Sequence, residues 1–91
     1  MKLFLVHAGF YDDNVSGGFY ESHTNYFVVA TDVKQAKQKA KALPEYKDKK
    51  MHIDGIKEID IVDGYRISLH ENNDGSTLDN SDYSYDEVKK M

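Results

Sequence analysis

The chain has 91 residues, of which 40% are hydrophobic and 31% charged, as in one folded globular domain. The absence of cysteine excludes disulfides, thiolate metal sites, iron–sulfur clusters and a cysteine nucleophile, and the net charge of −4 argues against nucleic acid as a partner. No apolar run approaches the roughly 20 residues of a membrane helix, and the N-terminus lacks the features of a signal peptide, so we expect a cytoplasmic protein without membrane contact.

Two strands are predicted in the first third of the chain, at residues 2–8 and 25–30. Both segments carry apolar residues at odd and even positions, a pattern typical of central strands in a sheet that is covered on both faces. The intervening residues 9–24 are rich in glycine, aspartate, asparagine and serine, which predicts a long loop.

A helix is predicted to follow the second strand. Thr31 and Asp32 are suitable N-cap residues, and Pro44 ends the pattern because the residue before a proline disfavours the helical conformation. Between them runs a narrow apolar stripe of small residues, which indicates a helix packed closely on the sheet. The stripe consists of Val33, Ala36, Ala40 and Leu43.

A hairpin is predicted around Asp63-Gly64. We expect a three-residue loop, residues 62–64, with Gly64 in the left-handed conformation as a bulge. This register opposes Ile61 to Tyr65 on a buried face, and it places Asp60 opposite Arg66 as an ion pair.

These elements together predict an α+β fold in the order ββαββ. We expect a four-stranded, mainly antiparallel sheet with one helix packed on one face, forming a single domain over residues 1–70. Residues 71–91 form a polar, acidic C-terminal tail, in which Ser84 and Glu87 fit a capping box for a short final helical turn.

The sheet face away from the helix is expected to be apolar. If Phe4, Val6, Phe27 and Val29 point away from the helix, they leave a patch of a size that monomers seldom expose. Either the tail covers this patch or a second copy of the chain does. Seven tyrosines in a short chain favour the second alternative, a homodimer.

Two pairs of ionisable residues form the candidate site. Glu21-x-His23 precedes the second strand, and His52-x-Asp54 precedes the third. Residues two apart on an extended segment point to the same face, so the four side chains form a metal or acid–base cluster if the two segments meet.

Other sequence features give no further site. The lysine-rich helix lacks interleaved aromatic residues and arginines, so it is interpreted as a solvated face and nucleic acid as an unlikely partner. No phosphate-binding glycine loop, serine nucleophile motif or complete calcium loop is present, so no cofactor is expected and catalysis is not favoured.

Several motifs resemble a small bacterial family known only as a domain of unknown function. Its members show two glycines after the first strand, then Glu-x-His-Asp, His-Ile-Asp and Val-Asp-Gly-Tyr, and this chain is similar over roughly residues 2–70. Ala8 replaces the first glycine, and Thr24 replaces the aspartate after the histidine. The resemblance draws attention to Glu21, His23, His52 and Asp54 but implies no activity, and the second replacement puts a ligand role at position 24 in doubt.

The sequence therefore favours a homodimeric or partner-binding module without catalysis. The alternative is a small metal-dependent or acid–base site built from Glu21, His23, His52 and Asp54. A regulator or inhibitor of another protein is a third alternative.

Overall fold

Strand β1 (Lys2–Tyr11) is the centre of a three-stranded antiparallel sheet in the computed structural model, which describes residues 1–78 and 81–91. It pairs with β2 (Glu21–Ala30) along one edge and with β3 (His52–Ile59) along the other. The two strands predicted at residues 2–8 and 25–30 are present. Both extend further into the predicted loop, which retains only a short 3-10 turn, η1 (Ser16–Gly18).

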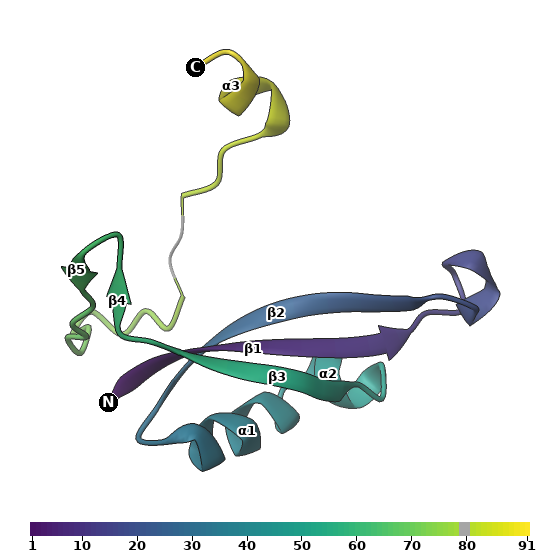
Figure 1. Cartoon of the computed structure of the whole chain (residues 1–91), viewed down its shortest axis with the longest axis horizontal. Coiled ribbons are helices and arrows are strands. Elements are labelled where there is room, and N and C mark those ends of the chain that lie inside the picture. Colours follow the sequence, from purple (N-terminus) through teal and green to yellow (C-terminus); the bar gives the residue numbers. More distant parts are fainter. Residues whose placement is uncertain (79–80) are drawn as a thin grey trace.

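Two helices cover one face of this sheet (Figure 1). Helix α1 (Val33–Lys41) begins at the predicted N-cap, where the Asp32 carboxylate accepts a hydrogen bond of 2.8 Å from the Gln35 amide. Pro44 ends the pattern of α1, but it also opens an unpredicted helix, α2 (Pro44–Asp48), because proline is well suited to the first helical turn.

The core lies between this helical layer and the sheet. Ala36 and Ala40 have no exposed surface, and the short side chains let α1 approach the strands closely. A second cluster forms where Tyr46 of α2 meets the far end of β1. The sheet contributes alternate residues of β1 and β2 to both clusters, namely Phe4, Val6, Ala8, Phe10, Val28 and Ala30.

A β-bulge in β3 positions both core and site residues. His7 pairs with Gly55 and Ala8 pairs with Ile53, so Asp54 is the extra residue between two ladder pairs. Ile53 and Ile56 are three residues apart and would face opposite sides of a regular strand. The bulge allows both to pack against the core.

The predicted fourth strand does not join the sheet. Tyr65–Arg66 (β5) pairs only with Ile61–Val62 (β4), as a separate two-stranded hairpin. The predicted bulged register is also wrong: Val62 pairs with Tyr65 across a two-residue turn in which both Asp63 and Gly64 have positive φ. Because Ile61, Val62 and Tyr65 are all more than half exposed, no buried face selects the register and the Asp-Gly turn decides it. The predicted ion pair between Asp60 and Arg66 is present, at 3.6 Å.

The sheet face opposite the helices is open, but only two of the four residues predicted for it lie there. Phe4 and Val6 are buried under α1, whereas Phe27 and Val29 lie on the open face, 70% and 41% exposed. Antiparallel pairing explains the division, because Leu3 and Leu5 of β1 lie opposite Val29 and Phe27. The apolar patch on this face therefore consists of Leu3, Leu5, Phe27 and Val29.

The predicted tail carries one short helix, α3 (Tyr85–Lys89), which lies apart from the sheet (Figure 1). Its N-cap is the predicted capping-box residue Ser84, whose Oγ accepts a 3.2 Å hydrogen bond from the Glu87 amide. Residues 79–80 of the tail lie outside the described part of the chain. Among the described residues, no helix has the length and apolar character needed to cross a membrane.

Candidate functional site

The four predicted site residues converge at one end of the open sheet face, although they come from two strands that do not pair with each other. Glu21 and His23 lie at the start of β2, and His52 and Asp54 lie at the start of β3. The central strand β1 ends between them, and its residue Gly9 pairs with His23 on one side and His52 on the other. The two segments, whose meeting the sequence left open, come together at this end of the sheet.

Four close contacts join the two imidazoles to the two carboxylates. His52 Nε2 lies 2.6 Å from Glu21 Oε1 and 3.2 Å from Asp54 Oδ1. His23 Nε2 lies 3.3 Å from the same Glu21 oxygen and 3.0 Å from Asp54 Oδ2. Each carboxylate therefore contacts both histidines. All four side chains remain between 31% and 48% exposed, so solvent reaches the cluster.

Hydrogen bonding alone does not account well for this arrangement. An imidazole Nε2 carries at most one proton, yet each of the two nitrogens faces two carboxylate oxygens. In a tetrahedral zinc shell with ligand distances of about 2.0–2.1 Å, neighbouring donor atoms lie about 3.3 Å apart. Three of the four contacts fall close to that separation, with Asp54 using one oxygen toward each histidine, and the contact between Glu21 and His52 is shorter.

Gly9 makes the convergence possible. A methyl group on its Cα would lie 2.6 Å from His52 Nε2 and 2.8 Å from Asp54 Oδ2, and it would also overlap Glu21 Oε1. The functional atoms from both outer strands therefore meet in the space directly above the central strand that a side chain at position 9 would occupy. The site is a shallow cradle whose floor is the buried backbone of Gly9.

A fifth candidate ligand, His7, was not predicted as part of the site. Its Nδ1 lies 2.8 Å from Asn25 Oδ1, and its ring stacks on that of His23 with centroids 4.8 Å apart. Donor atoms within 4.8 Å of one another form two groups that share Asp54: one with Glu21 and His52, and one with His7 and His23. The sequence held one signal for His7, its position two residues before Gly9 on an extended strand, but using that signal required the pairing register of β1 and β2.

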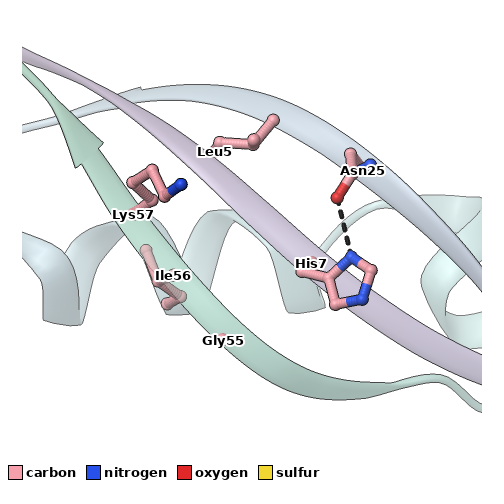
Figure 2. A pocket seen from close by; sticks show the side chains of 6 residues that line it. All are labelled: Leu5, His7, Asn25, Gly55, Ile56 and Lys57. Atoms are coloured by element: carbon pink, nitrogen blue, oxygen red, sulfur yellow. Dashed lines mark hydrogen bonds between the residues drawn. The ribbon is translucent and has the colours of Figure 1, made fainter.

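The contact between His7 and Asn25 is of the kind that orients metal-bound histidines. With Asn25 Oδ1 as acceptor, His7 Nδ1 carries the proton, and Nε2 on the far side of the ring keeps its lone pair (Figure 2). Asn25 thereby selects the tautomer in which His7 can act as a ligand through Nε2.

Thr24 lies on the opposite side of the sheet from the cluster. It pairs with the buried Ala8, whereas the site residues alternate with it along β2. A threonine in place of aspartate at this position therefore removes no ligand from the cradle. His70, the remaining histidine, lies elsewhere, with its Nε2 3.4 Å from Ser68 Oγ.

A hollow of about 340 Å³ lies next to the cluster, with His7 as the residue between them, and Figure 2 shows the residues that line it. His7 belongs to both features, since it lines the hollow and stacks on His23. The hollow is bordered by side chains of all three strands and by one glycine. Its lining consists of Leu5, His7, Asn25, Gly55, Ile56 and Lys57.

The fold and site define a small α+β domain with a histidine–carboxylate cluster on an open sheet face. The family model for Domain of Unknown Function (DUF1543) matches residues 18–69, more than half of the chain, and the chain belongs to this family. The matched segment contains Glu21, His23, His52 and Asp54, whereas His7 and Gly9 precede it. No curated protein and no solved structure matches the chain.

Proposed function

We propose that this domain binds one divalent transition-metal ion of the zinc class through Glu21, His23, His52 and Asp54. The observation that carries the proposal is the set of four nitrogen–oxygen contacts above Gly9, in which each of two carboxylates contacts both imidazoles. A cation between these groups replaces shared protons and offsets the repulsion between the two carboxylates.

The donor set determines the class of metal. Imidazole nitrogen suits Zn²⁺, Fe²⁺, Ni²⁺ and Cu²⁺, whereas Mg²⁺ and Ca²⁺ prefer sites made of oxygen alone. Without cysteine the chain offers no thiolate for softer ions such as Cu⁺. We therefore expect Zn²⁺ to bind with a Kd at least about a hundredfold lower than that of Mg²⁺ or Ca²⁺.

Because the cluster is partly exposed, a bound ion can also take a ligand from solvent. The four ligand side chains are only partly covered, so water or a small molecule can reach the ion from the open face. His7 stands beside this position as an additional ligand or as a hydrogen-bonding group for a bound molecule. A solvent-accessible ion of this kind serves binding or Lewis-acid chemistry rather than stabilisation of a buried core.

Calorimetric titration of the metal-free chain with Zn²⁺ tests the proposal. We expect saturation at one ion per chain, and we expect Asp54→Asn and His52→Ala to raise the Kd at least about tenfold each. Thr24→Ala, on the opposite sheet face, is the matched control and leaves the Kd unchanged. An absence of Zn²⁺ binding by the folded chain would reject the metal site and leave a hydrogen-bonded histidine–carboxylate cluster, the acid–base alternative.

A homodimer through the open face is a second candidate, favoured by one specific observation. Phe27 is 70% exposed at the centre of the apolar patch formed by Leu3, Leu5, Phe27 and Val29, and large exposed apolar patches mark interaction surfaces. Light scattering at two protein concentrations tests this idea, with Phe27→Ser as the disrupting variant. A mass equal to one chain at both concentrations would reject it.

A further inference from the structure

The hollow beside the cluster combines apolar walls with a small number of polar groups. Leu5 provides hydrocarbon surface, and Ile56, whose side chain packs on the core, borders the hollow, while Lys57 and the pair His7–Asn25 provide charge and hydrogen-bonding atoms. Ligand sites commonly have this composition, and about 340 Å³ lies at the small end of their range. The dimensions suit a molecule of a few carbon atoms.

Gly55 leaves the hollow open. It pairs with His7 and so lies on the open face, where a methyl group on its Cα would have nothing within 4 Å. Any side chain at this position would project into the hollow. The space above Gly55 is thus available to a ligand.

Lys57 supplies a positive charge on the same face. It pairs with Leu5 across the β1–β3 ladder, two residues from Gly55. Within residues 1–78 and 81–91 the Lys57 ammonium forms no ion pair, in contrast to Lys2, whose Nζ lies 3.4 Å from Glu58 Oε1. An anion entering the hollow would therefore not have to displace a carboxylate.

We propose that this hollow binds a small aliphatic carboxylate, with its anionic group at Lys57 and its hydrocarbon part above Gly55 and against Leu5. This proposal rests on the proposed metal site in one respect. His7 links the hollow to the cluster, so an ion held by the cluster would lie next to the carboxylate ligand. Phosphate would also be attracted by Lys57, but it would leave the hydrocarbon surface of Leu5 without a partner, and the hollow has no arginine or helix N-terminus for bidentate or backbone contacts.

Titration of the full-length ¹⁵N-labelled chain with hexanoate, with and without Zn²⁺, tests the proposal. We expect saturable NMR shifts at Leu5, Gly55 and Lys57, and a Kd at least about fivefold lower when Zn²⁺ is bound, because a second cation attracts the anion. Lys57→Gln is expected to raise the hexanoate Kd about tenfold or more, and Lys57→Arg to restore most of the affinity. Lys37→Gln, on the exposed side of α1, is the control for the loss of one positive charge.

Gly55→Val supplies an independent test that leaves the charge unchanged. Valine suits a strand and its Cβ would meet no atom within 4 Å, so we expect a folded variant with the hollow filled and hexanoate binding abolished. Undiminished hexanoate binding by both Gly55→Val and Lys57→Gln would overturn the proposal, as would a lack of hexanoate shifts in the wild-type chain. Zn²⁺ uptake is measured separately, so a chain that binds Zn²⁺ but no hexanoate loses only this inference. A chain that binds no Zn²⁺ loses the metal site.

Discussion

The Glu21 carboxylate reaches His52 across the full width of the central strand, with 2.6 Å between Oε1 and Nε2. The two residues start strands β2 and β3, which are separated by β1 and share no backbone hydrogen bonds. Side chains on alternate strands of a sheet normally have an intervening side chain between them. Here the intervening residue is Gly9, and the contact passes above its backbone.

Gly9→Ala should therefore weaken metal binding while leaving the stability of the fold nearly unchanged. The atoms that an added methyl group would meet are the ends of exposed side chains, which can rotate away in the metal-free protein. We expect the free energy of unfolding to change by less than about 1 kcal/mol, while the Kd for Zn²⁺ rises at least about tenfold because the ligand atoms can no longer converge. Urea unfolding and calorimetry measure the two quantities.

Gly55→Ala is the matched control for the effect of replacing a strand glycine by alanine. Gly55 lies on the same sheet face, and its added methyl group contacts nothing, so the unfolding free energy should stay equal or rise by up to about 1 kcal/mol. A Gly9→Ala variant with wild-type Zn²⁺ affinity would contradict a metal position above β1.

Asn25→Ala tests the role of the hydrogen bond that orients His7. The change leaves all four proposed ligands in place but removes the oxygen that lies 2.8 Å from His7 Nδ1. If His7 completes the metal environment, the Kd for Zn²⁺ should rise about 10- to 100-fold, as for other losses of a group that orients a ligand. The ¹⁵N chemical shifts of the His7 ring report its tautomer directly. An unchanged tautomer and an unchanged Kd together would show that His7 takes no part.

Local patterns in the sequence were sufficient to predict α1 and the first three strands. The spacing within each pair also predicted that Glu21 with His23, and His52 with Asp54, would share faces on an extended segment, although residues 21–24 were expected in a loop. Their convergence stayed conditional, because it depends on β1 lying between β2 and β3. Strand order is set by long-range pairing, which leaves little trace in one sequence.

Two errors of prediction have a common cause: the sequence does not show which side chains are buried. The bulged register at Gly64 assumed that Ile61 and Tyr65 pack on a buried face, but both are more than half exposed and the local turn prevails. Phe4 and Phe27 were assigned to one face because each strand is apolar on both parities, and alternation then gives no sign of which parity faces the helix. Only the register of β1 against β2 separates them.

Phe4→Ala and Phe27→Ala should therefore have very different effects on stability. Phe4 is 1% exposed under α1, and its truncation leaves a cavity that should cost about 3–5 kcal/mol of unfolding free energy. Phe27 is 70% exposed, so the same truncation should change the value by about 0.5 kcal/mol or less. Both are measured by urea unfolding at a protein concentration where the wild type is monomeric. Similar losses for the two variants would contradict the assignment of faces.

The pKa of Tyr26 should lie above the usual value for a tyrosine. Burial on the helical side of β2, followed by the nearby Glu45 carboxylate, raises the pKa of Tyr26 to about 12 from the usual 10.0. Because the folded chain holds this proton more tightly, the associated stability is fully present below pH 10 and is lost as the pH rises from 10 to about 12.

Absorbance at about 295 nm during alkaline titration measures phenolate formation, and Tyr26→Phe should remove the step near pH 12. Glu45→Gln should lower the pKa of Tyr26 only in part, because burial is the larger cause and persists in this variant. Circular dichroism recorded in parallel distinguishes phenolate formation in the folded chain from unfolding at high pH. A complete return of the pKa to 10.0 in Glu45→Gln would show that the carboxylate, rather than burial, controls this tyrosine.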